Sequence, residues 1–152
     1  MAINCFRGWH GFLSNFYEVP VEYDGIIYGS VEAAFQAQKC IDDEEKRKFS
    51  DLRPVKAKKA GMRVPLRKDW EDVKLEIMKA LVQAKFTQNS ELAQRLLSTG
   101  EAELIEGNDW NDLFWGVDLR TGQGENHLGR ILMKIREEIR KEGHILEGAD
   151  HD

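Results

Sequence analysis

The stretch SVEAAFQAQK, from Ser30 to Lys39, has the composition of a helix that is buried on most of its sides. Ser30 is a favourable N-cap residue, so we expect a helix from Ser30 to about Cys40. Alanine, valine and phenylalanine occupy most of its circumference, whereas a helix on the surface normally has a wide polar face. The stretch therefore predicts a helix at the centre of the fold.

The polar residues of this helix fall on one narrow stripe. With successive residues about 100° apart around the axis, Glu32, Gln36 and Lys39 lie within about 60° of each other. This stripe is either part of a functional site or an ordinary edge of the surface. In a site, Glu32 could act as a general acid or base, or stabilise a cationic sugar. A desolvated Lys39 could attack carbon as a neutral amine, although a nearby Glu32 anion opposes that loss of charge unless other cations are close.

The remainder of the chain reads as a mainly α-helical single domain with a small β-hairpin near its start. Residues 19–28 predict the hairpin, because Asp24-Gly25 is a favoured type I′ turn between strand-forming runs. Asp69 and Ser90 are the expected N-caps of two later helices. The further helices are expected at 54–61, 69–86 (with Trp70, Val73, Ile77 and Leu81 inward), 90–100 and 126–142, with Gly143 ending the last. We expect a domain of residues 1–143 and a C-terminal tail of residues 144–152.

Composition limits the class of protein. The chain has 152 residues, 32% of them charged and 41% hydrophobic, which is ordinary for a globular protein. It has no apolar run long enough to cross a membrane and no evident signal peptide, so we expect a cytoplasmic protein without a membrane partner. Cys5 and Cys40 are expected to be free thiols, and the scattered histidines predict no metal site. No cofactor and no obligate protein partner is indicated.

Positive charges gather in one segment although the chain as a whole is acidic. The net charge of −5 argues against a broad surface for duplex nucleic acid. The segment still offers either a phosphate site or a solvated helix face, and both interpretations stay open. Its cations are Arg53, Lys56, Lys58, Lys59, Arg63, Arg67 and Lys68.

The segment 106–126 is too long and too aromatic for a simple connection. Asp112 stands beside Phe114 and Trp115, an arrangement that suits either a ligand for a base or sugar, or a turn capped by the aspartate. The run TGQGEN then leads into the last helix, and a glycine-bearing loop at a helix N-terminus is a weak signal for phosphate binding.

Seven motifs in a fixed order resemble the NADAR superfamily, also called the YbiA-like family. They are LSNFY, YGSVEAAFQAQK, PLRKDWEDVK-x3-M, KFTQN, LLSTGEAELIE, ND-x2-WG and G-x-N-x-LG-x2-LM-x-IR. The resemblance runs from about Phe6 to Arg140. It implies a compact, mainly helical YbiA-like fold and N-glycosidase activity. It also implies two substrate classes: ADP-ribose attached to guanine, and the phosphorylated ribosylamino-pyrimidine intermediates of riboflavin biosynthesis.

The resemblance also implies roles for single residues. Lys39 corresponds to the lysine proposed to form a Schiff base with the sugar, and Glu32 and Asp112 to the family's acidic positions. Other matched positions imply substrate binding by Asn15, Phe16, Trp70, Gly124 and Asn126. Gln36 and Trp115 join this set from the stripe and the aromatic segment, and Arg7, Arg53 or Arg67 could hold phosphate. After WG, this chain has Val117 and then Asp118 where another member has Asp-Gly-Gly, so the contacts of that loop can differ.

These residues predict an N-glycosidase that removes ADP-ribose from guanine in DNA or a nucleotide, a substrate favoured by the chain's small size and lack of a fused biosynthetic domain. The riboflavin-type substrate is the alternative within the same chemistry. A non-catalytic sensor of NAD or ADP-ribose is a third hypothesis, but it needs no reactive amine. A helical interaction module is a fourth, and it requires Glu32 and Lys39 to face open solvent.

Overall fold

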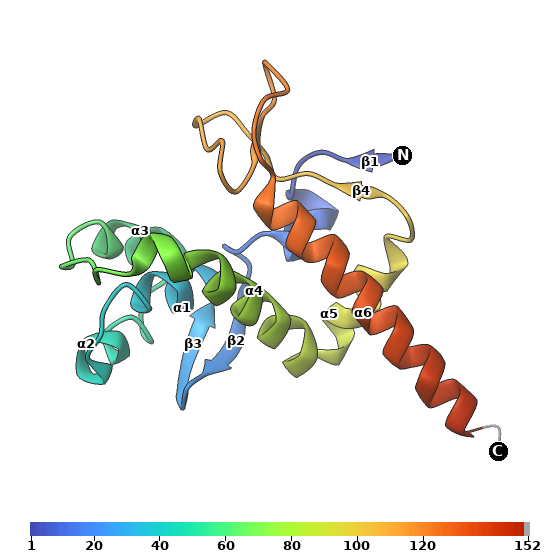
Figure 1. Cartoon of the computed structure of the whole chain (residues 1–152), viewed down its shortest axis with the longest axis horizontal. Coiled ribbons are helices and arrows are strands. Elements are labelled where there is room, and N and C mark those ends of the chain that lie inside the picture. The colour runs from blue at the N-terminus through green and yellow to red at the C-terminus, as the bar shows by residue number, and fades with distance from the viewer. Residues whose placement is uncertain (151–152) are drawn as a thin grey trace. The chain divides into compact units, whose positions relative to one another are not determined.

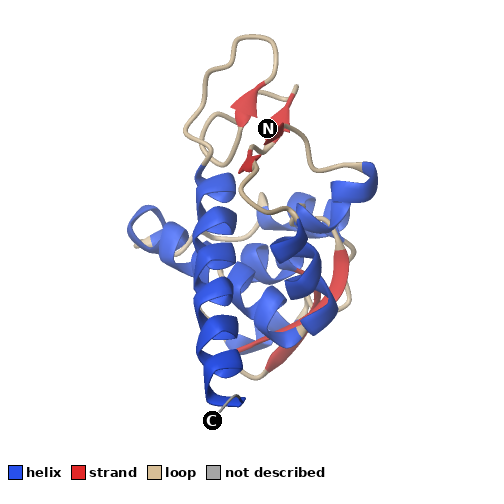
Figure 2. Ribbon diagram, turned by 90° about the vertical axis from the view of Figure 1, so that its right-hand side faces the viewer, coloured by secondary structure: helices blue, strands red, loops and turns tan. Residues whose placement is uncertain are grey.

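Helices make up most of the structure and the strands are short (Figure 2). The computed structural model describes the backbone of residues 1–150 and the side chains of residues 1–143. Within the described residues, no helix is long and apolar enough to cross a membrane. The predicted mainly helical class with an N-terminal hairpin is confirmed.

The chain forms two units, and the first to be described comprises residues 14–88. It opens with the antiparallel hairpin of β2 (Glu18–Tyr23) and β3 (Ile26–Ser30). Asp24 and Gly25 have φ values of 50° and 83°, as a type I′ turn requires at both central positions. The predicted hairpin is therefore confirmed.

The hairpin leads directly into α1 (Val31–Ala37), whose seven residues are all buried. The Ser30 hydroxyl accepts a hydrogen bond from the Ala33 N–H at 3.1 Å, which confirms the predicted N-cap. The helix packs against β3, α3 and α4 (Figure 1). The other helices of this unit are α2 (Asp43–Arg47), α3 (Pro54–Gly61) and α4 (Trp70–Gln88).

The buried face of α4 differs in part from the predicted one. Trp70 and Leu81 are buried as expected, whereas Val73 and Ile77 are only half-buried. Met78 and Lys85 are buried in addition, with 1% of each residue exposed. The interior therefore receives a charged residue that the hydrophobic pattern did not include.

The second unit comprises residues 1–13 together with the chain from Asn89 onward. Two pairs of very short strands are parallel: β1 (Ala2–Ile3) with β4 (Glu103–Leu104), and β5 (Gly107–Asn108) with β6 (Val117–Asp118). A 3-10 helix covers Gly8–Leu13. The helices are α5 (Ser90–Ser98) and α6 (His127–Asp150).

Two predicted helix ends in this unit are wrong. Asn89 is the N-cap of α5 and Ser90 is its first helical residue, so Ser90 does not cap the helix. α6 passes through Gly143 and ends at Asp150. A glycine costs only about 1 kcal/mol inside a helix, so it need not end one. The predicted division into a domain of residues 1–143 and a tail stays a prediction, and residues 151–152 lie outside the described residues.

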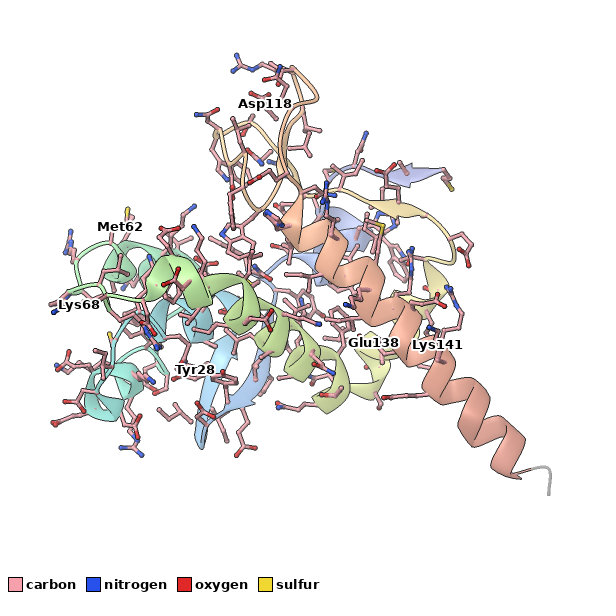
Figure 3. The ribbon with its side chains drawn as sticks, viewed as in Figure 1. Tyr28, Met62, Lys68, Asp118, Glu138 and Lys141 are labelled. Carbon is pink, nitrogen blue, oxygen red and sulfur yellow. The ribbon has the colours of Figure 1, made fainter. Side chains whose placement is uncertain are left out.

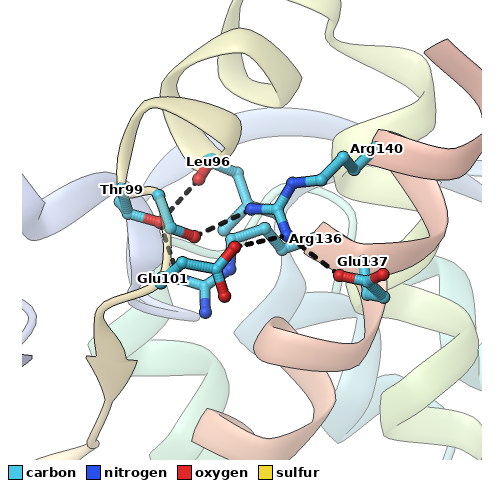
Figure 4. A network of polar contacts seen from close by, with 7 residues as sticks. Leu96, Thr99, Glu101, Arg136, Glu137 and Arg140 are labelled. Carbon is cyan, nitrogen blue, oxygen red and sulfur yellow. Dashed lines mark hydrogen bonds and ion pairs between the residues drawn. The ribbon is translucent and has the colours of Figure 1, made fainter. Parts of the chain in front are cut away.

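A polar network joins the end of α5 to α6 (Figure 4). The buried Arg136 donates to the Thr99 hydroxyl at 2.9 Å, and that hydroxyl donates to the Leu96 carbonyl at 2.6 Å. One α6 turn later, Arg140 donates to the Gly100 carbonyl at 2.8 Å and pairs with Glu101 at 3.1 Å. The network thus gives the Leu96 and Gly100 carbonyls at the end of α5 side-chain donors, in addition to the Thr99 N–H that the Leu96 carbonyl accepts.

Candidate active site

Glu32 and Gln36 form a buried hydrogen-bonded pair on α1. Gln36 Nε2 donates to Glu32 Oε1 at 2.9 Å, and the two residues are only 6–7% exposed. The pair lies one helical turn apart, as the i, i+4 spacing requires. Because both side chains are buried, the polar stripe of this helix is not a solvated surface edge, and the interaction module loses its main support.

Gly61, the last residue of α3, leaves the space that the Gln36 amide occupies. A Cβ atom at Gly61 would overlap Gln36 Oε1. That oxygen is buried, and no group among the described residues donates a hydrogen bond to it. A side chain at position 61 would therefore displace the Gln36 amide from this position.

α1 ends at Ala37 and not near Cys40 as predicted, so Lys39 lies two residues beyond the helix, where it is half-buried. Its ammonium group makes a long hydrogen bond of 3.5 Å to the Gly61 carbonyl and lies 5.9 Å from the centre of the Trp70 ring. Burial lowers the pKa of Lys39, the Glu32 charge opposes this effect, and the Lys58 charge adds to it. A neutral Lys39 requires a further cation close by to offset the Glu32 charge, and Lys58 is such a cation.

Two of the predicted aromatic residues lie close to a lysine: Trp70 to Lys39 and Phe16 to Lys58. Trp70, at the start of α4, is 6% exposed, and its ring packs against Phe35 with 4.9 Å between ring centroids. Phe16 is 39% exposed, and Lys58 Nζ lies 5.9 Å from its ring. Of these two predicted binding residues, only Phe16 has a substantial open surface in this structure.

The turn that carries Asn15 and Phe16 is held from α1 and α4. The Asn15 carbonyl accepts the Glu32 N–H at 3.0 Å. Asn15 Nδ2 donates a hydrogen bond to Met78 Sδ at 3.4 Å. Lys85 Nζ donates to the Ser14 carbonyl at 3.0 Å. Sequence reasoning missed Lys85, although its position seven residues after Met78 puts both on one face of α4.

Arg67 lies in the segment between α3 and α4 and bonds within this segment and to the residues after α1. Its guanidinium group makes two hydrogen bonds to the Asp69 carboxylate, at 2.6 and 2.9 Å. The backbone N–H of Arg67 donates to the Lys39 carbonyl at 3.1 Å. A phosphate at Arg67 would have to compete with Asp69. Met62 and Lys68 of the same segment are exposed (Figure 3).

Arg53, also a predicted phosphate ligand, makes two hydrogen bonds to the Glu18 carboxylate, each at 2.9 Å. A phosphate there would therefore have to compete with Glu18.

The other predicted site residues belong to the second unit, residues 1–13 and 89 onward. Asp112 Oδ1 accepts the N–H groups of Phe114 and Trp115, at 3.2 and 3.0 Å. The buried Asn108, which sequence reasoning missed, bonds in both directions with the Asp112 backbone at 3.0 Å. Asp112 thus caps a turn, which is the structural alternative in the sequence analysis. Both hydrogen bonds to its carboxylate end on Oδ1, and neither uses Oδ2.

Trp115 is part of an aromatic cluster that extends to α6. Its ring meets Phe114 edge-on at 4.7 Å between centroids, and Phe114 lies 4.5 Å from the His127 ring. Trp115 is half-buried in this cluster. The cluster fixes the orientation of the turn that Asp112 caps.

Asn126 and Gly124 have specific backbone roles. Both ends of the Asn126 amide bind backbone, accepting from the Glu106 N–H and donating to the Leu104 carbonyl, each at 3.0 Å. Gly124 has φ 144°, and a Cβ there would overlap the Gly116 carbonyl. Arg7 is exposed. Binding of substrate by these three residues stays a prediction.

The NADAR domain family matches residues 4–140 of the chain. The chain belongs to this family. It is 42% identical over 135 residues to the N-glycosidase YbiA of Escherichia coli, covering 86% of this chain and 82% of that protein. It is 34% identical to an N-glycosidase of Nostoc punctiforme, over 92% of this chain and 94% of the relative. A riboflavin biosynthesis protein of Vibrio vulnificus is 40% identical over 87% of this chain, which spans 36% of that protein.

The fold of the NADAR family is also found among solved structures. The NMR structure of E. coli YbiA matches with a TM-score of 0.82 and 36% identity, over 94% of this chain and 86% of that one. The predicted YbiA-like fold is therefore confirmed. At the level of the family, the predicted enzyme class, a hydrolase acting on N-glycosyl compounds, is confirmed as well.

Proposed function

We propose that this NADAR protein hydrolyses a ribosyl C1–N bond and that Lys39 is the nucleophile. The observation that carries the proposal is the environment of Lys39, a half-buried amine with a lowered pKa beside the Glu32–Gln36 pair. Burial of a lysine increases its neutral fraction, and the neutral amine is the form that attacks carbon. A protein that only binds its ligand does not need this arrangement, which argues against the sensor hypothesis.

The proposed reaction proceeds through an imine. The Lys39 nitrogen lone pair attacks C1, and the base leaves with the electron pair of the C1–N bond and takes one amine proton. The ring oxygen then leaves C1 with its bonding electrons and takes the second amine proton, so that an imine joins Lys39 to C1. Water adds to the imine carbon, which releases the sugar and restores the neutral amine.

Glu32 would stabilise the positive charge that develops on the sugar as the bond breaks. Its carboxylate accepts the Gln36 amide at 2.9 Å, and a donated hydrogen bond stabilises an anion. Asp112 is proposed as a second acidic group through Oδ2, because the Phe114 and Trp115 N–H groups both bind to Oδ1. Phe16, Trp70 and Trp115 are proposed to contact the base or sugar.

The proposed substrate is ADP-ribose attached to guanine, with the phosphorylated ribosylamino-pyrimidines as the second candidate. Both contain a ribosyl C1–N bond near phosphate. The second candidate is favoured by the names of the relatives from Vibrio vulnificus and from Zea mays, a riboflavin biosynthesis protein that is 31% identical over 90% of this chain. We place the activity in the cytoplasm, in keeping with two cysteines that are free thiols.

A paired assay tests the proposal: ADP-ribosylated guanine in an oligonucleotide against a ribosylamino-pyrimidine phosphate, scored by released base. We expect release from one of them, and its loss in Lys39→Ala and Glu32→Ala. Lys48→Ala is the matched control, because Lys48 is exposed and pairs only locally with Glu45. Full activity in both Lys39→Ala and Glu32→Ala would exclude the mechanism, and no release from either substrate would exclude both candidates.

A further inference from the structure

Lys58 belongs to α3, the helix whose last residue, Gly61, contacts Lys39. It precedes Gly61 by three residues, so the two positions are neighbours on the helix surface. The Gly61 carbonyl is the group to which Lys39 Nζ donates at 3.5 Å. Lys58 therefore lies one helical turn before Gly61, the α3 residue whose carbonyl accepts the Lys39 amine.

Lys58 also lies near the turn that carries Phe16. Its ammonium group lies 5.9 Å from the centre of the Phe16 ring. Phe16 follows Asn15, whose carbonyl accepts the Glu32 N–H. Lys58 thus lies near Lys39 through α3, and near Glu32 through the turn that carries Asn15 and Phe16.

Lys58 differs from Arg67 in having no ion-pair partner among the described residues, and its side chain is exposed. By contrast, Arg67 is neutralised by Asp69, to which it makes two hydrogen bonds. Lys58 is therefore an uncompensated cation of α3, and its charge acts on Lys39.

We propose that Lys58 is a positioning residue for the reaction, whose charge on α3 favours the neutral amine of Lys39 next to the Glu32 carboxylate. The inference rests on the proposed role of Lys39 as nucleophile. A cation next to a reactive lysine disfavours a second positive charge, and this is one established way of activating such an amine. It also resolves the competition between the two roles, since an ionised Glu32 alone would hold Lys39 as an ammonium ion.

The charges around Lys39 act in the directions that this proposal needs. Burial and the Lys58 charge lower the pKa of Lys39, and the Glu32 charge raises it. From the segment before α4, the Arg67–Asp69 pair contributes opposite charges that largely cancel. The neighbouring Cys40 thiol contributes no charge at neutral pH, because burial raises its pKa.

The test is a titration of Lys39 itself, by labelling with an acylating reagent over a range of pH and mapping of the modified peptide by mass spectrometry. We expect Lys58→Gln to move the midpoint of Lys39 labelling to higher pH and Glu32→Gln to move it to lower pH. Lys58→Arg keeps the charge and should leave the midpoint close to that of the natural protein. At neutral pH, base release by Lys58→Gln should fall by about threefold to tenfold and recover as the pH is raised.

An unchanged midpoint of Lys39 in Lys58→Gln would overturn the inference. So would a raised KM in Lys58→Gln with no change in the pH profile of kcat, because Lys58 would then only bind substrate. If the midpoint moves as expected but the natural protein releases no base, the proposed function fails while the coupling of Lys58 to Lys39 stands. The labelling thus separates the two failures.

Discussion

At the scale of single residues, one missing methyl group makes room for the Glu32–Gln36 pair. In Gly61→Ala, the new Cβ would occupy the position of Gln36 Oε1. We expect displacement of the Gln36 amide, a loss of about 1–3 kcal/mol in the free energy of unfolding, and at least a tenfold loss of base release. Urea denaturation and a kinetic assay measure the two effects.

Gly29→Ala is the control for that substitution, because no atom lies within 4 Å of a Cβ at Gly29 and its φ is not positive. Its free energy of unfolding and its activity should stay close to those of the natural protein. Equal losses in the two variants would show that the Gln36 contact has no special role.

The pH dependence of the reaction should reflect the pKa of Lys39. That pKa lies below the ordinary lysine value because burial disfavours the ammonium form. The neutral amine attacks, so the rate rises with pH up to the pKa of Lys39 and then levels off. We expect this rise to be complete at lower pH than for an exposed lysine, as measured by single-turnover base release. A rate that still rises through the ordinary lysine range would contradict the lowered pKa.

At the scale of elements, two serines at helix starts distinguish a real cap from an apparent one. The Ser30 hydroxyl accepts the Ala33 N–H, whereas Ser90 is the first residue of α5 and Asn89 is its N-cap. We expect Ser30→Ala to cost about 1 kcal/mol of unfolding free energy, and Ser90→Ala to cost less than about 0.5 kcal/mol. Equal values in urea denaturation would contradict this assignment.

The elements also show which local signals suffice. The Asp24-Gly25 hairpin and the Ser30 cap follow from backbone chemistry within a few residues, so the sequence predicts them correctly. The end of α6 does not follow, because Gly143 costs the helix too little to end it. The prediction that Ser90 is the N-cap of α5 is wrong because serine also occurs at the first helical position. Only the backbone conformation of Asn89 decides which residue is the cap.

At the scale of the whole molecule, the network between α5 and α6 should contribute to stability. Thr99→Val removes the hydroxyl that accepts from the buried Arg136 and should cost about 1–3 kcal/mol, since it leaves a buried donor unsatisfied. Thr87→Val is the control, because the Thr87 hydroxyl bonds only to Ala84 at an exposed position. Similar unfolding free energies for the two variants would show that the network adds little.

Motif order over the whole chain predicts the family and the helical fold, and helical periodicity places Glu32 and Gln36 on one face of α1, whereas Lys39 lies beyond the end of that helix. Motif order does not predict Lys58, Gly61 or Lys85 as neighbours of the site, because their roles depend on how α3 and α4 approach α1 and the turn at Ser14–Tyr17. Charge and size alone make Lys58 look like any other member of the basic segment. Packing between distant segments therefore supplies what the motifs lack.

In the proposed mechanism, the Lys39 amine forms a covalent bond to C1 of the sugar. Borohydride reduction during turnover, with ADP-ribosylated guanine and with a ribosylamino-pyrimidine phosphate, would make such an imine permanent, and peptide mapping would locate it. We predict a sugar adduct on the peptide that contains Lys39, and none in Lys39→Arg, which should also lose base release. Base release without any adduct at Lys39, and undiminished in Lys39→Arg, would contradict the mechanism.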